Sequence, residues 1–256
     1  MNKQNQNRIV IMGATSGLGR RLALRYIEAG WTAGLAGRNI GKLEELQSVA
    51  PDRVEIERID ITCDDAVERL GILIEKIGGM NVYLHCSGIL TDEDELTEDS
   101  QSRVIATNTM GFAVMTSAAY RYFRDNNGSI ADRRQIAAIT SIAGIRGLAE
   151  LPGYSASKAF DIHYLEALRQ RADARRLSLA VTDIRPGWTR TPLLSSGRRY
   201  LLEMDEKRVA DLIYRAIERK SGNVVIGMRW KVLTTLQRML PAGIWKKIHL
   251  PLWRDK

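Results

Sequence analysis

The chain has 256 residues, enough for a substantial core, and its 45% hydrophobic and 27% charged composition is typical of a globular protein. No apolar run approaches the roughly 18 residues of a membrane-spanning helix, and the first eight residues lack the apolar core of a secretory signal. Cys63 and Cys86 are the only cysteines and have no metal-type spacing, so we expect no metal site and a reducing compartment, by default the cytoplasm.

The net charge of +8 is concentrated at the end of the chain. Residues 229–256 carry seven Lys or Arg and one acid, whereas the other 228 residues carry 31 Lys or Arg and 29 acids. An enzyme that acts on nucleic acid more often has a basic stripe on its folded body. We therefore expect no nucleic-acid partner.

The first predicted strand, residues 8–12, is a short apolar run that stops at a glycine-rich turn. The turn reads Gly13-Ala14-Thr15-Ser16-Gly17-Leu18-Gly19, and a helical pattern follows at 20–29. In this context glycines allow close backbone approach to a pyrophosphate, which then sits on the helix N-terminus. The alternative is a plain strand-to-helix turn.

The second predicted strand, residues 31–36, ends in Gly37-Arg38-Asn39. Folds that bind NAD usually place an acid about 20 residues beyond the glycines, to hold the ribose hydroxyls. Arg38 suits a 2′-phosphate instead, so we expect NADP(H), with NAD(H) as the alternative cofactor. The other interpretation of Arg38 is a solvated surface side chain.

The same alternation continues along the chain. Further strands are expected at 54–59, 81–85, 135–140, 177–184 and 224–227, and helices at 42–49, 64–77, 101–124, 154–172 and 205–218. The acidic stretch 92–99 is interpreted as a solvated loop or the first turn of a helix, without a role in substrate binding.

Seven strands separated mostly by helices predict an α/β fold, because parallel pairing requires crossover connections. We expect a Rossmann-type, doubly wound, parallel seven-stranded sheet with helices on both faces. No composition break divides the chain. Residues 1–228 are therefore expected to form one dinucleotide-binding domain that includes the catalytic site, and 229–256 a C-terminal extension.

Four residues have the chemistry of an acid–base site. Tyr154 and Lys158 lie one turn apart on a helix, where the ammonium favours the phenolate and lowers its pKa. Ser141 follows a strand, at the sheet edge where such folds bind ligands, and Asn108 interrupts a helix. Taken singly, each has an ordinary alternative: a core tyrosine, a surface lysine, a loop serine and an asparagine at a kink.

Taken in order, these motifs resemble the short-chain dehydrogenase/reductase family over roughly residues 7–228. The motifs that carry the resemblance are the glycine turn, Asp60, Ser87-Gly88, Asn108, Ser141, Tyr154, Lys158, and Pro186-Gly187 with Thr191. The resemblance implies that Tyr154 is the general acid and base, that Lys158 binds the nicotinamide ribose and lowers the tyrosine pKa, and that Ser141 binds the substrate oxygen. Asn108 would anchor a water that relays protons to Lys158.

The resemblance also implies a set of cofactor contacts. Besides Asn108, Tyr154 and Lys158, these are Gly13, Thr15, Ser16, Gly17, Leu18 and Gly19 at the pyrophosphate, Arg38 and Asn39 at the 2′-phosphate, Asp60 and Ile61 at the adenine, Cys86, Ser87 and Gly88 after the fourth strand, and Pro186, Gly187, Thr189 and Thr191 at the nicotinamide.

One motif departs from the family pattern. Where the family usually has Asn-Asn-Ala-Gly, this chain has His85-Cys86-Ser87-Gly88, which bears on cofactor affinity. We interpret His85 as a core histidine and Cys86 as a small buried residue. Ser16 also lacks the basic character that some NADP-preferring members have at this position, so Arg38 would provide the preference largely alone.

The C-terminal extension has an apolar stripe at helical spacing among basic residues. The stripe comprises Val232, Leu233, Leu236, Met239 and Leu240, and Pro241 ends it. Together with Trp230, Trp245 and Trp253 it suits a helix on an anionic membrane surface. The alternatives are packing on the body, on a partner subunit or as a lid over the substrate cleft, and a disordered tail.

These observations predict an NADP(H)-dependent oxidoreductase for a small ketone or secondary alcohol. Trp188, Leu193 and Leu194 suggest that the substrate is apolar. The alternatives are a catalytically inactive NADP-sensing regulator or scaffold of the same fold, and an epimerase or dehydratase. By resemblance, we also expect a homodimer or homotetramer that pairs the helices containing Asn108 and Tyr154.

Overall fold

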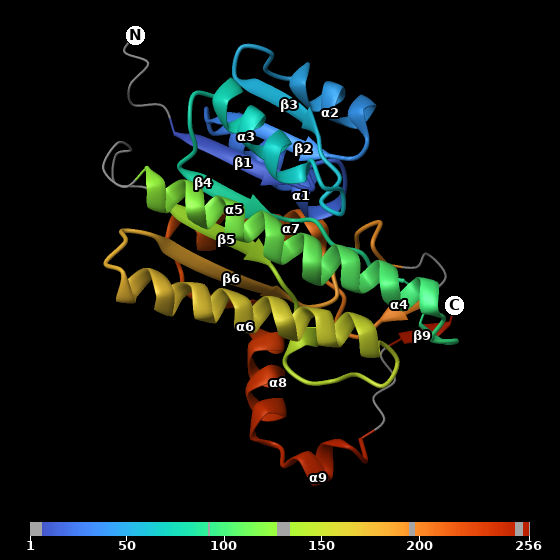
Figure 1. Cartoon of the computed structure of the whole chain (residues 1–256). Helices are drawn as coiled ribbons and strands as arrows, with labels where there is room; N and C mark the ends of the chain where they lie inside the picture. Colours follow the sequence, from blue (N-terminus) through green and yellow to red (C-terminus); the bar gives the residue numbers. More distant parts are fainter. Residues whose placement is uncertain (1–6, 92, 127–133, 195–197, 249–252, 256) are drawn as a thin grey trace.

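The structure is a computed structural model that describes residues 7–91, 93–126, 134–194, 198–248 and 253–255. Its centre is a seven-stranded sheet whose neighbouring strands all pair in parallel (Figure 1). In spatial order the strands are β3 (Val54–Arg58), β2 (Thr32–Gly37), β1 (Arg8–Met12), β4 (Val82–His85), β5 (Gln135–Ile139), β6 (Ala180–Pro186) and β8 (Asn223–Ile226). The predicted doubly wound sheet is confirmed.

Helices cover both faces of this sheet, because alternate residues of each buried strand point to opposite sides. One face packs on α3 (Ala66–Lys76), α5 (Phe112–Asp125) and α6 (Pro152–Ala174). The other packs on α1 (Gly17–Glu28), α2 (Ile40–Gln47) and α7 (Glu206–Glu218). The sheet order reverses between β1 and β4, which opens a crevice at the carboxyl ends of these strands.

The long helix expected at 101–124 consists of three segments. α4 (Glu98–Val104) leads into a π-helical segment (Ile105–Gly111), and α5 continues from it. Asn108 lies in the π-helical segment, so the expected irregularity at this residue is present. A mid-helix π segment widens the turn and often marks a functional position.

The C-terminal extension continues directly from the sheet. α8 (Met228–Met239) follows β8, Pro241 precedes α9 (Ala242–Trp245), and both helices project from the body (Figure 1). A short antiparallel pair of β7 (Arg198–Tyr200) and β9 (Trp253–Asp255), which the sequence did not predict, ties the end of the chain back. In the described part of the chain, no helix is long and apolar enough to cross a bilayer.

Candidate active site

Two adjoining cavities occupy the carboxyl edge of the sheet. The first, of about 260 Å³, runs along the glycine turn and the ends of β2, β3 and β4. The second, of about 330 Å³, lies beyond β5 and β6 and reaches the C-terminal helices. Leu18, Ile139, Thr191 and Leu193 line both, so a ligand in the first cavity borders the second.

The glycine turn shapes one end of the first cavity. Gly13 has φ of 90°, and a Cβ there would lie 2.7 Å from the backbone N of Ser87, so only glycine fits. Ser16, Gly17, Leu18 and Gly19 line the cavity at the N-terminus of α1, whose first turn contains no acid. This arrangement suits a pyrophosphate, because the free N–H groups and the helix dipole attract an anion.

Arg38 lies at the far end of the first cavity with an exposed side chain. Arg58, which the sequence analysis did not single out, is also exposed and donates from Nε to the carbonyl oxygen of Arg38 at 3.3 Å. Arg38 thus lies where an NADP 2′-phosphate is expected, and Arg58 lies beside it. Arg58 comes close to Arg38 because its strand, β3, pairs with β2.

Two other residues expected at this end make local hydrogen bonds. Asn39 does not line the cavity; its Oδ1 accepts a hydrogen bond from Lys42 N at 3.1 Å and caps α2. Asp60 and Ile61 do line it, and Asp60 Oδ1 accepts from Thr62 N and Oγ1 at 3.0 and 2.8 Å. A contact between Asn39 and the 2′-phosphate stays a prediction, and it would compete with the cap of α2 for the Asn39 side chain.

Cys86, Ser87 and Gly88 line the first cavity, while His85 before them is buried. His85 Nδ1 lies 2.9 Å from the Tyr83 hydroxyl, and its ring packs edge-on against Phe112. Burial, reinforced by the nearby charge of Lys158, lowers the pKa of His85 to about 3. His85 is therefore neutral near physiological pH, in agreement with its interpretation as a core histidine.

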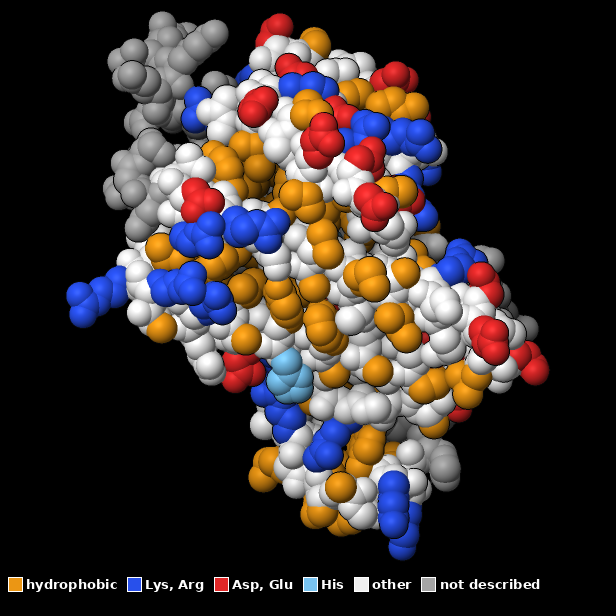
Figure 2. Space-filling view, viewed as in Figure 1, with side chains coloured by type: hydrophobic (Ala, Val, Ile, Leu, Met, Phe, Trp, Pro, Cys, Tyr) orange, Lys and Arg blue, Asp and Glu red, His pale blue; other side chains and the backbone are white. Residues whose placement is uncertain are grey.

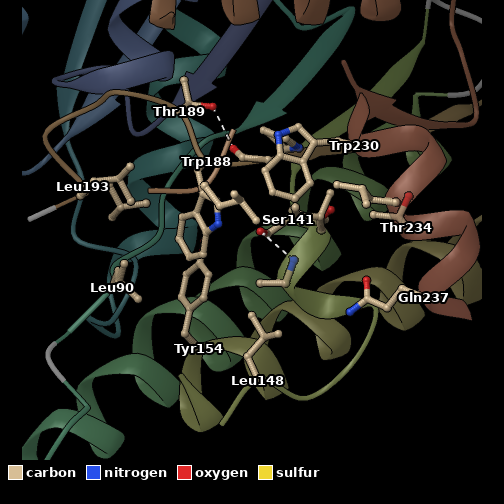
Figure 3. Close-up of a pocket in the computed structure, with 18 of the residues that line it drawn as sticks. Leu90, Ser141, Leu148, Tyr154, Trp188, Thr189, Leu193, Trp230, Thr234 and Gln237 are labelled. Atoms are coloured by element: carbon tan, nitrogen blue, oxygen red, sulfur yellow. Dashed lines mark hydrogen bonds between the residues drawn. The ribbon is translucent and has the colours of Figure 1, made fainter. Parts of the chain in front are cut away.

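Tyr154 and Ser141 line the second cavity where it meets the first (Figure 3). Burial raises the pKa of Tyr154 above its usual 10, while the charge of Lys158 and a hydrogen bond with Ser141 act to lower it. Lys158 Nζ lies 5.9 Å from the centre of the Tyr154 ring. The structure thus brings together the hydroxyl groups and the ammonium that the sequence placed 17 residues apart along the chain.

Asn108 lies behind these groups and lines neither cavity. Its Oδ1 accepts from Ile89 N at 2.8 Å, and its Nδ2 donates to Ile89 O at 2.9 Å and to Ser157 Oγ at 3.1 Å. The side chain therefore fastens the loop after β4 to α6. The water relay expected at Asn108 stays a prediction.

Asp161 is a buried partner of Lys158 that the sequence analysis missed. Its Oδ2 accepts a hydrogen bond from Lys158 Nζ at 2.8 Å, and both side chains are at least 95% buried. Burial is the main influence that raises the pKa of Asp161, to about 6. Asp183, paired with Arg185 on β6, adds a second buried ion pair nearby.

Glu93 corrects the interpretation of 92–99 as a solvated stretch. Its side chain is buried, and its two carboxylate oxygens accept from Gly153 N at 2.7 Å and Tyr154 N at 2.8 Å. The acid thus satisfies free N–H groups at the start of α6, beside Tyr154. The sequence did not distinguish Glu93 from its neighbours, because six of the eight residues in the stretch are acids and most are exposed.

The second cavity is mainly apolar. Pro186, Gly187, Trp188 and Thr189 form one side, and the expected apolar residues Leu193 and Leu194 line it as well (Figure 3). The opposite side comes from the C-terminal extension, through the residues Trp230, Leu233, Thr234, Leu236, Gln237, Leu240, Trp245 and Ile248. The extension therefore forms a wall of the cavity.

Trp230 anchors this wall to the body. It is buried, and its ring packs so closely on Gly187 that no side chain would fit there. The indole N–H is buried and has no hydrogen-bond partner among the described residues. The spacing of the stripe indicated the helix but not this contact.

Comparison with known proteins agrees with the fold and the arrangement of the site. A family model described as short chain dehydrogenase matches residues 7–200. An uncharacterized oxidoreductase of Myxococcus xanthus (strain DK1622) is 31% identical over 241 residues, which cover 91% of this chain and 92% of the relative.

Solved structures share the fold at lower identity. A short-chain dehydrogenase from Streptomyces avermitilis has a TM-score of 0.76 at 21% identity, over 90% of this chain and 92% of that one. One from Sphingobium yanoikuyae, in complex with NADPH, has a TM-score of 0.75 at 19% identity, over 96% and 97%. The chain belongs to the short-chain dehydrogenase family. It is an NAD(P)-dependent oxidoreductase that acts on CH–OH or C=O groups.

Proposed function

We propose that this protein transfers a hydride between NADP(H) and an apolar ketone or secondary alcohol, with Tyr154 as the general acid and base. The observation that carries the proposal is the place of Tyr154 and Ser141, which line the apolar cavity where it adjoins the cavity of the glycine turn. A carbonyl bound there would face the tyrosine on one side and the dinucleotide on the other.

The chemistry follows from these positions. When bound, the nicotinamide supplies the hydride in reduction and accepts it in oxidation. Tyr154 donates its phenolic proton to the carbonyl oxygen in reduction, and in oxidation its phenolate removes the proton of the alcohol. Ser141 donates a hydrogen bond to the same oxygen, and Lys158 stabilises the phenolate by its charge.

The preference for NADP(H) rests on Arg38 and Arg58. Arg38 lines the end of the first cavity, Arg58 donates a hydrogen bond to its backbone carbonyl, and neither takes part in an ion pair found among the described residues. Arginine binds phosphate through two parallel hydrogen bonds, and its positive charge attracts the negative 2′-phosphate. The Sphingobium yanoikuyae structure, which contains NADPH, has the same fold.

An apolar substrate is favoured by the walls of the second cavity. Trp188, Leu193 and Leu236 line it, and its few polar groups include those of Ser141, Tyr154, Thr234 and Gln237. Apolar walls with a few convergent polar groups are typical of small-molecule sites. In such a site, burial of apolar substrate surface contributes to binding, and hydrogen bonds orient the reacting oxygen.

Two alternatives use the same fold. A dinucleotide sensor or scaffold would need the first cavity but not Ser141, Tyr154 and Lys158 together. An epimerase or dehydratase would keep the nucleotide site, and would be recognised by turnover without net oxidation of the cofactor. We also infer assembly as a homodimer or homotetramer through α5 and α6, whose exposed apolar residues are described below.

The replacement Tyr154→Phe tests the proposal. A panel of aldehydes, ketones and secondary alcohols is followed by NADPH absorbance, with NADH assayed alongside. We expect turnover to fall about 10²- to 10⁴-fold, because the acid–base group is lost, while NADPH binding measured by fluorescence persists. Tyr122→Phe is the matched control, since the Tyr122 hydroxyl accepts a hydrogen bond from Met80 N at 3.0 Å and Tyr122 lines neither cavity.

Two results would contradict the proposal. If Tyr154→Phe and the unmodified chain turn over substrate equally, Tyr154 is not the acid–base group. If NADH is preferred over NADPH, the assignment of Arg38 and Arg58 is wrong.

A further inference from the structure

The C-terminal helices expose an apolar surface that the catalytic site does not account for. On α8 and α9 the exposed residues are Met228, Val232, Leu233, Leu236, Met239 and Ile244, with exposed fractions from 41% to 75%. We call this set the tail surface. Figures 1 and 2 show that it projects from the body, where hydrophobic and basic side chains gather together.

The charge of this projection has a single sign. Between residues 228 and 248 there are five Lys or Arg and no Asp or Glu: Arg229, Lys231, Arg238, Lys246 and Lys247. All five are exposed. Basic residues that flank exposed apolar ones are the arrangement by which amphipathic helices bind anionic lipid at the bilayer interface.

The tail surface is continuous with the substrate cavity. Leu233 and Leu236 line the cavity and are also 41% and 56% exposed, so they form its rim. Val232 and Met239 belong to the tail surface but do not line the cavity. A molecule that lies against the tail surface would therefore reach the cavity along apolar side chains.

The projection is held in place by the loop before α6. Arg146 Nη2 donates to the carbonyl oxygens of Arg238 and Leu240 at 3.4 and 2.5 Å, where a cation suits the C-terminus of α8. Trp245 Nε1 donates to Gly147 O at 3.0 Å. The tail surface is thus presented by helices fixed to the body.

We propose that the tail surface docks the protein on an anionic lipid bilayer, and that the cavity receives its apolar carbonyl substrate from that bilayer. The second clause rests on the proposed function, whereas the first does not. Apolar residues would enter the interface, the five cations would face the lipid phosphates, and the rim at Leu233 and Leu236 would open toward the acyl chains.

Charge distinguishes this partner from a second copy of the chain. In a two-fold symmetric contact the same patch meets itself, so two sets of five cations would face each other without acids from this segment. Like charges in contact oppose association. An anionic bilayer instead complements both the charge and the apolar surface.

Co-sedimentation with vesicles tests the docking. The full-length chain is mixed with phosphatidylcholine vesicles and with vesicles that also contain 30% phosphatidylglycerol, at about 0.1 and 0.5 M salt. We expect binding to the anionic vesicles at low salt, and weaker binding at high salt. The double variants Val232→Asp/Met239→Asp and Lys246→Glu/Lys247→Glu should each bind at least about tenfold more weakly, because apolar burial or charge attraction is lost.

The control is Val49→Asp/Ile72→Asp, which makes the same kind of change at exposed apolar residues of the body and should bind like the unmodified chain. A further arm supplies a long-chain methyl ketone in the vesicles and follows NADPH. Turnover should fall with vesicle binding in the tail variants, whereas turnover of a water-soluble ketone should not.

The outcomes separate the two proposals. Vesicle binding without ketone turnover supports docking and contradicts the proposed function. A full-length chain that stays in the supernatant overturns the docking, as does equal sedimentation of the tail variants and the control. If the tail variants instead lower the native mass, the surface is an interface between copies of the chain and the docking is wrong.

Discussion

At the scale of single residues, the buried pair of Lys158 and Asp161 sets the charge around Tyr154. Lys158 Nζ lies 2.8 Å from one carboxylate oxygen of Asp161, and the other oxygen has no hydrogen-bond partner among the described residues. The charge of Asp161 acts to raise the pKa of Tyr154, opposite to the action of Lys158. Asp161 therefore offsets part of the activation that the lysine provides.

The replacement Asp161→Asn should lower the pKa of Tyr154, because a negative charge near the phenolate is removed. Alcohol oxidation needs the phenolate, so its activity rises with pH through this pKa. In the variant that rise should occur at lower pH. The difference in activity between Asp161→Asn and the unmodified chain should disappear below about pH 6, because Asp161 is then protonated and uncharged in the unmodified chain.

The measurement is the pH profile of kcat/KM for NADP⁺-dependent oxidation. Asp173→Asn, an exposed acid on the same helix, is the control and should leave the profile unchanged. A profile of Asp161→Asn that coincides with this control, or that moves to higher pH, would show that Asp161 does not tune Tyr154.

At the scale of secondary-structure elements, α6 depends on a carboxylate from outside the helix. The helix begins at Pro152, and the side chain of Leu151, at the N-cap position before it, makes no capping hydrogen bond. Glu93 instead accepts hydrogen bonds from Gly153 N and Tyr154 N. The same contact closes the helix end and holds the backbone of Tyr154.

The replacement Glu93→Ala should lower the free energy of unfolding by about 1–3 kcal/mol, because two hydrogen bonds to a charged group are lost. It should also lower kcat by about tenfold through displacement of Tyr154. Thermal unfolding and steady-state kinetics measure the two effects. Glu93→Gln keeps an accepting oxygen and should be intermediate, while Glu95→Ala, an exposed neighbour, should match the unmodified chain. Equal melting temperatures for Glu93→Ala and Glu95→Ala would refute the cap.

The elements themselves were predictable because their signals are local. Apolar runs and helical periodicity located the seven strands of the sheet, and the spacing of Tyr154 and Lys158 predicted that they lie one turn apart on a helix. Asp161, Glu93 and Arg58 were not predictable in the same way. Their partners are defined by burial, by a loop that folds over a helix end, and by the pairing of β2 with β3, none of which a single sequence displays.

At the scale of the whole molecule, a second exposed apolar surface lies over the π-helical segment, α5 and α6. Ile105, Met110 and Val114, on the π-helical segment and α5, and Phe160 on α6 are exposed by 36% to 65%. Figure 2 shows hydrophobic side chains gathered over these two helices. We expect a second copy of the chain to cover them, because the patch carries no net charge of its own and can meet itself in a two-fold contact.

The double variant Met110→Glu/Val114→Glu tests this interface. It places charges where the contact would bury them, so the native mass should fall by half or more. Light scattering after size exclusion gives the mass, and NADPH binding shows that the fold is kept. Ile72→Glu, at an exposed apolar residue of α3, should leave the mass unchanged. So should Val232→Asp/Met239→Asp if the tail surface binds lipid. A monomeric mass for the unmodified chain, or a variant with unchanged mass, would exclude assembly through α5 and α6 and would leave these residues free for another partner.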